Sequence, residues 1–260
     1  MTTNAFDGLA LEYDAEFTAT SLGSVLRAMV WRRYESCLAG RERLLEIGCG
    51  TGEDAVHLAR RGHRVLATDA SAQMVHIGQA KAERAGVADR IRFLCLPMEK
   101  LAAKLAGEVF DGTYSNFGAV NCVSHLEASI AGLATLLKAG APLVWVVMGR
   151  FVPWEWAWYL ARGEARKAFR RLSPAGVEWR GLTINYPTPT SLQRALRPHF
   201  SSRGARSLGF ALPPSYAGHW LERSPRALAA LTRLERAAQD WPGCASLADH
   251  YILEATRRTA

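Results

Sequence analysis

Short apolar runs alternate along the chain with segments in which apolar residues recur every three or four positions. Such runs are typical of buried strands, and the spacing between them is typical of amphipathic helices. The runs that we interpret as the first five strands are 43–48, 63–69, 90–95, 109–115 and 141–149. Since strands that alternate with helices form parallel sheets covered on both faces, the pattern predicts an α/β fold.

The segments between these runs carry the usual signals of helix ends. One helix is expected to start at Glu53, and Ser71 is placed to cap a second that runs toward Gly86. A third is expected over 124–138, where an Ala-Gly pair follows its last residue. Each expected helix therefore lies between two consecutive strands.

An insertion rich in tryptophan and arginine interrupts this alternation after the fifth strand. We expect it, over about 151–186, to form a lid with a helix that starts at Pro153. On that helix three arginines would repeat every four residues: Arg162, Arg166 and Arg170.

The core pattern resumes after the insertion and continues to the end of the chain. The expected elements are a helix over 191–199, a strand over 203–212, an inserted helix over about 224–240 and a last strand over 250–255. No linker or repeat divides the chain. The expected organisation is an N-terminal helical cap segment, 1–40, followed by one domain, 41–260, that carries both insertions.

Composition narrows the class of protein. No uncharged apolar run reaches the roughly 18 residues that a membrane span needs, and the N-terminus lacks the basic start and apolar centre of a signal peptide. We therefore expect a cytoplasmic protein. The five cysteines are odd in number and form no C-x-x-C pair, which disfavours a disulfide framework or a zinc site.

The net charge of +8 raises the question of a nucleic-acid partner. Of the 32 basic residues only five are lysine, so 27 are arginine, and they are scattered among acidic residues. This distribution resembles a compositional bias more than a binding stripe. We expect no nucleic-acid partner, although charge alone keeps an RNA acceptor open.

The segment 44–52, LLEIGCGTG, is the strongest functional signal in the sequence. Gly48, Gly50 and Gly52 would let the backbone turn sharply after a strand and approach a ligand closely, beside the free N–H groups of a following helix. Asp69 ends the second strand, 17 residues after Gly52, where a carboxylate can accept hydrogen bonds from ribose hydroxyls. The pattern predicts a nucleoside-binding site.

The loop differs from the dinucleotide fingerprint. That fingerprint is G-x-G-x-x-G, whereas this chain has G-x-G-x-G. In addition, Glu46 precedes the loop, where it would repel a pyrophosphate and could face an ammonium group. A ligand with a ribose and an amino group, and without phosphates, suits the sequence better.

The motifs EIGCGTG, TDAS and FDGTYSNF resemble those of class I S-adenosylmethionine-dependent methyltransferases of the small-molecule type. The resemblance implies a Rossmann-like three-layer sandwich with a seven-stranded, mostly parallel sheet of order 3-2-1-4-5-7-6. It also implies S-adenosyl-L-methionine as the cofactor and S-adenosyl-L-homocysteine as its product. The 41–260 domain would then be the methyltransferase domain.

The resemblance also implies a set of cofactor-binding residues, with Asp69 on the ribose and Met74 near the adenine. Met74 is equally interpretable as a helix core residue, and Tyr13 as an ordinary helix end. The relatives' usual adenine-binding Asp is replaced here by Pro97, so Met98 or Glu99 would have to serve, or Glu99 is only a solvated carboxylate. The predicted set is Tyr13, Glu46, Gly48, Cys49, Gly50, Asp69, Ala70, Met74, Met98, Glu99 and Asn116.

Methyl transfer from a sulfonium is an in-line displacement, and positioning alone lowers much of its barrier. A general base is therefore optional. The candidates on loops at the expected active edge are His125, His219 and Tyr216, with Asn116 beside the reacting centre, and each histidine is alternatively a surface residue. The segment SNFG replaces the (Asn/Asp)-Pro-Pro-aromatic motif, which argues against methylation of DNA amines.

The tryptophan-rich insertion is the best indication of the acceptor. Phe117, Arg150, Trp154 and Trp158 are expected to border a small hydrophobic or aromatic metabolite, methylated on O, N or C. The alternatives are tryptophans packed on the domain or on a second subunit, a membrane-surface lid for a quinone or lipid, and a non-catalytic cofactor-binding partner protein. The chain is expected to be a monomer or a homodimer without a metal.

Overall fold

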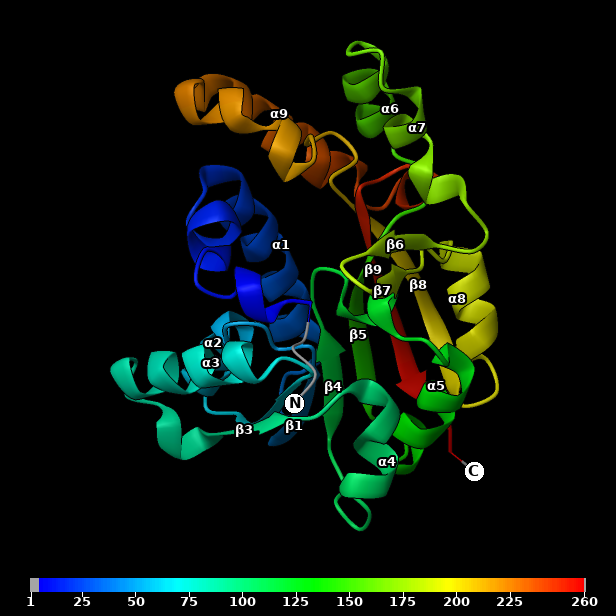
Figure 1. Ribbon diagram of the computed structural model, residues 1–260. Helices are drawn as coiled ribbons and strands as arrows, with labels where there is room; N and C mark the ends of the chain where they lie inside the picture. Colours follow the sequence, from blue (N-terminus) through cyan, green and yellow to red (C-terminus); the bar gives the residue numbers. More distant parts are fainter. Residues whose placement is uncertain (1–4, 260) are drawn as a thin grey trace.

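Seven strands form one sheet in the computed structural model, which describes residues 5–259 (Figure 1). The order across the sheet is β3-β2-β1-β4-β5-β9-β8. The bounds are β1 Arg43–Ile47, β2 Arg64–Asp69, β3 Ile91–Cys95, β4 Gly112–Ser115, β5 Pro142–Met148, β8 Phe200–Leu208 and β9 His250–Arg257. Only β9 runs antiparallel to its neighbours β5 and β8.

This order confirms the predicted topology. The predicted sixth and seventh strands are β8 and β9 in the structure. The numbering differs because two further strands, β6 Val177–Trp179 and β7 Leu182–Ile184, form a separate hairpin inside the insertion. The parallel strands place their carboxyl ends at the upper edge of the sheet in Figure 1. Ligands of open α/β sheets bind at that edge.

Helices cover both faces of the sheet (Figure 1). Neighbouring strand residues point to opposite faces, so Leu44 and Val144 pack on one side while Leu45 and Trp145 pack on the other. The first layer holds α1 Ser21–Cys37, α2 Glu53–Ala59, α3 Ala72–Arg84 and, above them, α9 Pro225–Ala238. The second layer holds α4 Leu101–Lys104, α5 Leu126–Thr135 and α8 Pro189–Leu196. The predicted three-layer sandwich is confirmed.

Side-chain caps, one of them predicted, explain where two helices begin. The Ser71 hydroxyl accepts a hydrogen bond from the Met74 N–H, as predicted, and Thr188 caps α8 in the same way. Gly86, with φ of 68°, follows the end of α3. Local chemistry therefore determined these helix ends correctly.

The predicted strand over 203–212 is wrong at both ends. β8 starts at Phe200 and stops at Leu208, and the apolar residues that follow form a loop. The buried Glu235 carboxylate of α9 accepts hydrogen bonds from the N–H groups of Gly209, Ala211 and Leu212. Since these donors are satisfied by a side chain, the segment needs no strand partner.

The insertion contains two short helices instead of one long one. α6 covers Pro153–Leu160 and α7 covers Ala165–Ala168, so the predicted helix that carries three arginines at four-residue spacing is wrong. Gly163, with φ of 73°, adopts the left-handed conformation after α6, and the Glu164 N–H donates to the Tyr159 carbonyl. The helix therefore ends before the first of these arginines, Arg162.

The N-terminal segment precedes the sheet and folds beside the glycine loop. It consists of the 3-10 helix η1 Asp7–Leu9, the π-helical turn η2 Asp14–Thr18 and then α1. Residues 1–4 of the predicted cap lie outside the described residues.

The end of the insertion is fixed to β5 by Asn121. This fully buried side chain hydrogen-bonds the backbones of both Met148 and Asn185.

Candidate cofactor and acceptor site

The glycine loop after β1 turns through three left-handed residues. Gly48, Gly50 and Gly52 have φ of 69°, 50° and 76°. A Cβ on Gly48 would lie 2.0 Å from the Ala119 Cβ, whereas a Cβ on Gly50 would meet nothing within 4 Å. Gly48 is therefore required by packing, and the space beside Gly50 is open for a ligand.

Asp69 ends β2 directly beside this loop. Its two carboxylate oxygens accept hydrogen bonds from the Gly50 N–H at 2.8 Å and the Ser71 N–H at 2.9 Å. Burial raises the pKa of Asp69, although backbone N–H groups oppose that effect. The carboxylate links the loop to α3 and keeps further lone pairs for ribose hydroxyls.

Glu46 lies on β1 under the loop, and only 1% of it is exposed. Its Oε2 has no hydrogen-bond partner among the described residues. Burial, with the nearby charge of Asp54, holds the pKa of this carboxyl well above its usual range. A buried acceptor without a partner is unfavourable, and a cationic amino group from a ligand would satisfy it.

A second buried carboxylate, Asp54 of α2, is fully occupied by protein donors. It accepts hydrogen bonds from Arg27 at 2.8 Å, from the Trp31 indole at 2.6 Å and from the Asn116 amide at 2.8 Å. Asn116 also accepts from the Phe117 N–H. The Asn116 side chain is thus held in place, and it orients the residue that follows.

Phe117 has a strained backbone, with φ of 41°. Its ring contacts Phe17 edge-on at 4.6 Å and His250 edge-on at 5.5 Å, and Arg27 lies 5.1 Å from its centroid. Such outliers persist where the surroundings enforce them, often at functional sites. The ring is half-buried, just after the end of β4.

The N-terminal segment is tied over the loop by an ionic cluster that we call the Lys81 clasp. The Lys81 ammonium contacts Asp14 at 2.7 Å, Glu53 at 2.9 Å and Thr51 at 3.1 Å. Burial raises the pKa of Tyr13, one residue before Asp14, and the charges of Arg27 and Asp69 also act on its hydroxyl. The structure therefore brings Tyr13 toward the loop carboxylates.

The remaining predicted cofactor residues occupy the same edge with different exposure. Cys49, Met74 and Met98 are buried, whereas Ala70 is exposed. The exposed Glu99 accepts a hydrogen bond from the Ser124 N–H at 3.1 Å and therefore caps the loop before α5.

The predicted base candidates differ in their surroundings. His125, before α5, and His219, in η8 His219–Arg223, are both exposed. The Tyr216 hydroxyl donates to Glu155 at 2.9 Å, and burial raises its pKa above the usual range, with a further contribution from Glu155. None of the three is brought to Phe117 by a described ring contact.

An ionic network under the lid was missed by the sequence analysis. Glu155 of α6, 1% exposed, contacts Arg170 at 2.9 Å and Arg171 at 2.7 Å, and Arg171 also contacts Asp249 at 2.8 Å. Asp249 lies 3.1 Å from His250. The adjacent Asp249 and His250 at the start of the last strand are a sequence signal that could have indicated part of this network. Glu155 lies between two tryptophans, and nothing in its neighbours indicated a buried acid.

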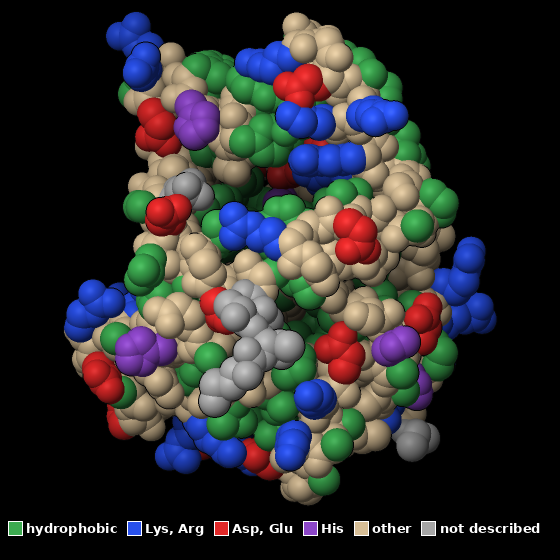
Figure 2. All heavy atoms as spheres, in the orientation of Figure 1, with side chains coloured by type: hydrophobic (Ala, Val, Ile, Leu, Met, Phe, Trp, Pro, Cys, Tyr) green, Lys and Arg blue, Asp and Glu red, His purple; other side chains and the backbone are tan. Residues whose placement is uncertain are grey.

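A hollow opens beside the helices of the lid. Figure 2 shows it in the upper part of this face, between the sides of α9 and of α6 and α7, with hydrophobic walls and basic side chains along its rim. Trp154 and Trp158 are half-buried, and Arg162 stacks on Trp158 at 3.4 Å. Arg150 donates to the Leu172 carbonyl at 2.6 Å, which ties the lid to the end of β5.

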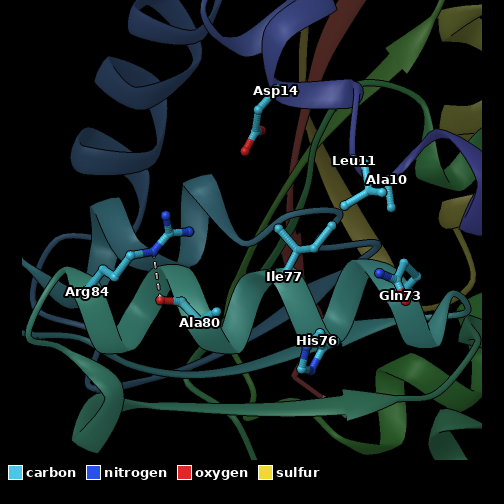
Figure 3. A pocket seen from close by; sticks show the side chains of 8 residues that line it. All are labelled: Ala10, Leu11, Asp14, Gln73, His76, Ile77, Ala80 and Arg84. Atoms are coloured by element: carbon cyan, nitrogen blue, oxygen red, sulfur yellow. Dashed lines mark hydrogen bonds between the residues drawn. The ribbon is translucent and has the colours of Figure 1, made fainter.

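A second hollow, of about 450 Å³, lies between the N-terminal segment and α3 (Figure 3). It uses a face of α3 other than the one that packs on the sheet, and Arg84 donates there to the Ala80 carbonyl. Its lining residues are Ala10, Leu11, Asp14, Gln73, His76, Ile77, Ala80 and Arg84. It does not include the glycine loop.

Two further features of residues 5–259 bear on function. Their helices include none that is both long enough and apolar enough to cross a bilayer. Within the same residues, histidine, cysteine and acidic side chains form no cluster of three able to bind a metal ion.

Comparison with known proteins finds similarity over part of the chain. Residues 44–140 match the family model described as a methyltransferase domain. A tRNA 5-carboxymethoxyuridine methyltransferase of Escherichia coli K12 is 32% identical over 104 residues, 38% of this chain and 40% of that protein. A demethylmenaquinone methyltransferase of Thermobifida fusca is 32% identical over 142 residues, 54% and 57% of the two chains.

The fold as a whole also has solved counterparts. A 1,6-didemethyltoxoflavin-N1-methyltransferase of Burkholderia thailandensis, solved with its substrate and S-adenosylhomocysteine, has a TM-score of 0.57 and 17% identity. The match covers 98% of this chain and 87% of that one. The chain thus has a class I methyltransferase fold, while it spans about half the length of the curated relatives named above.

Proposed function

We propose that this chain, whose residues 44–140 match a methyltransferase domain within a class I fold, transfers a methyl group from S-adenosylmethionine to a small molecule. The observation that carries the proposal is the pair of carboxylates beside the glycine loop. Glu46 would hold the ammonium group of the cofactor, and Asp69 would hold its ribose hydroxyls. The bound cofactor supplies a methyl group already activated by a sulfonium.

The residues of the site suit such a ligand and disfavour a dinucleotide. The Asp69 carboxylate, bonded to the Gly50 N–H beside an open space, would repel a pyrophosphate. A sulfonium with an ammonium and a ribose offers instead a cation for Glu46, whose Oε2 lacks a partner. The half-buried Phe117 ring and the N-terminal segment held over the glycine loop would limit the access of water to the transfer.

The acceptor is proposed to be a small hydrophobic or aromatic metabolite. The hollow in Figure 2 has apolar walls. The half-buried rings of Trp154, Trp158 and Phe117 are the candidates to contact the acceptor. Planar rings suit walls of this kind. Basic side chains along the rim would favour an acceptor that carries an acidic group.

Calorimetric titration with S-adenosylmethionine and, separately, with NAD tests the cofactor assignment. We expect binding of the first and no binding of the second. Asp69→Ala should weaken binding about 10- to 100-fold, since a hydrogen bond to a charged group is worth roughly 1.5–3 kcal/mol. Asp89→Ala, an exposed acid after α3, is the matched control. Binding of NAD, or an unchanged affinity in Asp69→Ala, would contradict the assignment.

A further inference from the structure

An aspartate and a histidine lie together at the carboxyl edge of the sheet, away from the glycine loop. Asp249 precedes β9, and His250 is its first residue, paired with Met148 at the end of β5 and Leu208 at the end of β8. Because β9 is antiparallel to these strands, its first residue lies where they end. His250 therefore shares its edge with Phe117 and with the proposed cofactor site.

Of the two ring nitrogens of His250, one contacts a carboxylate and the other has no hydrogen-bond partner among the described residues. Its Nδ1 lies 3.1 Å from the Asp249 Oδ2, and no described residue hydrogen-bonds its Nε2. The ring meets Phe117 edge-on at 89°, and its side chain is 12% exposed. The ring is thus held among protein groups, with only a small part of its side chain exposed.

Asp249 is held so that it orients this ring. Its other oxygen contacts Arg171 at 2.8 Å, and Arg171 is fixed in turn by Glu155 at 2.7 Å. Burial alone would raise the pKa of Asp249, but the charges of His250 and Arg171 outweigh it and hold that pKa below its usual range. A carboxylate beside Nδ1 favours the tautomer with the proton on Nδ1, which leaves the Nε2 lone pair available.

We propose that His250 takes the proton of the acceptor during methyl transfer and that Asp249 is its positioning residue. The inference rests on the proposed function and deepens it. A lone pair of the acceptor oxygen or nitrogen forms the bond to the methyl carbon, and the broken carbon–sulfur bond leaves its electron pair on sulfur. The proton of the acceptor moves to the His250 Nε2, and the resulting imidazolium is stabilised by Asp249.

This geometry selects the chemical class of the acceptor. A base beside the reacting centre is useful for a hydroxyl or a protonated amine, since the nucleophile is stronger once its proton is removed. The site is therefore assigned to O- or N-methylation of an aromatic or apolar acceptor. The exposed His125 and His219 lack a comparable carboxylate partner in the described contacts, and the Tyr216 hydroxyl is already donated to Glu155.

The test combines His250→Gln with His250→Phe, which keeps an aromatic ring against Phe117. His199→Gln, on the opposite edge of the sheet, is the matched control. Each protein is incubated with methyl-labelled S-adenosylmethionine and a low-molecular-weight extract of the producing organism. Initial rates are measured across pH, calorimetry gives cofactor affinity, and NMR identifies the labelled atom.

We expect both His250 variants to bind the cofactor within threefold of the wild type and to lose about 100-fold or more in the rate of transfer. The transfer rate of the wild type should increase with pH more steeply than the rate of either variant. The charged groups linked to the His250 ring, Asp249, Arg171 and Glu155, remain in the variants, as does Arg27 over the neighbouring Phe117 ring.

Three outcomes would overturn the inference, and they are distinguishable. Label on a carbon atom, or variant rates within threefold of the wild type, would exclude His250 as the proton acceptor while leaving the proposed methyltransferase intact. If the wild type itself binds no S-adenosylmethionine or transfers no label, the proposed function fails, and the inference fails with it.

Discussion

Glu46 shows at the scale of one residue how stability and ligand binding oppose each other. Its carboxyl is buried under the glycine loop, its Oε2 has no partner, and its pKa is well above the usual range because of burial and Asp54. A folded-state pKa above the unfolded value means that stability falls as pH rises from the unfolded toward the folded pKa. The free protein is therefore destabilised by ionisation of a group that the cofactor would use.

We predict that Glu46→Gln stabilises the cofactor-free protein at neutral and higher pH, with the gain disappearing at acid pH where Glu46 is protonated in both states. Affinity for S-adenosylmethionine should fall about 10- to 100-fold, through loss of a charge-assisted hydrogen bond. Denaturant unfolding at several pH values and calorimetry measure the two effects. A variant that is less stable at pH 8, or that binds as tightly as the wild type, would contradict this account.

The same residue predicts proton release on binding. If the cofactor ammonium meets Glu46, the carboxyl must ionise, and the proton passes to the buffer. The calorimetric enthalpy of wild-type binding should therefore depend on the ionisation enthalpy of the buffer, and this dependence should be smaller in Glu46→Gln. Equal enthalpies in phosphate and Tris would contradict ionisation of Glu46.

The sequence correctly predicted the conformation of residues whose structural role depends on their immediate neighbours in the chain. The turns at Gly48, Gly50 and Gly52 and the cap at Ser71 follow from a few neighbouring residues. Glu155 and Arg171 were missed because their burial depends on partners far along the chain, Tyr216 and Asp249. Spacing within a segment carries no information about such contacts.

At the scale of elements, the Lys81 clasp connects three parts of the chain. Lys81 of α3 holds Asp14 in the N-terminal segment and Glu53 at the start of α2, and its side chain is only 17% exposed. These contacts hold the segment over the proposed cofactor site. The clasp therefore links closure of the site to the position of a single ammonium group.

We predict that Lys81→Met lowers stability only on the order of 1 kcal/mol, as for partly exposed ion pairs, but speeds cofactor dissociation several-fold. Lys100→Met, an exposed lysine in η4 Met98–Lys100, is the control. Stopped-flow displacement gives the rate, and limited proteolysis reports the freed segment. An unchanged dissociation rate together with unchanged cleavage would show that the clasp does not hold the segment closed.

The lid depends on Glu155 in a different way, because the residue is buried between two arginines. Removing it takes away one of the two carboxylates that neutralise the buried Arg171 and the acceptor of the Tyr216 hydroxyl, so Glu155→Ala should cost about 3–5 kcal/mol in the free energy of unfolding. Glu164→Ala, which removes a surface pair with Lys167, should cost less than about 1 kcal/mol. Denaturant unfolding of the two variants checks the contrast, and similar losses would contradict the role of the network.

Helices and strands with a strong local pattern were predicted well. Those whose bounds depend on contacts with residues distant in the sequence were not. The first five strands lie within a few residues of their predicted bounds because their apolar runs are buried on both faces. The hairpin of β6 and β7 was missed within the insertion, and β8 was predicted to extend too far. In the second case the N–H groups of 209–212 bind Glu235, a partner that no strand pattern reveals.

At the scale of the whole molecule, three separate parts of the chain meet above the sheet. Phe6 of the N-terminal segment contacts Trp179 of the lid hairpin at 5.0 Å, and Ser21 at the start of α1 binds Glu222 in η8 through two hydrogen bonds. The hollow in Figure 2 thus lies among caps that also touch one another. Such an enclosure suits a small acceptor better than a folded RNA.

The most direct test of the account is to follow the methyl group. Purified protein is incubated with methyl-labelled S-adenosylmethionine and an extract divided into a low-molecular-weight fraction and an RNA fraction, and the labelled product is identified by mass spectrometry. The account predicts label in a small hydrophobic or aromatic compound, and none with Asp69→Ala at low cofactor concentration. Label in the RNA fraction, or no label in either fraction despite cofactor binding, would contradict it.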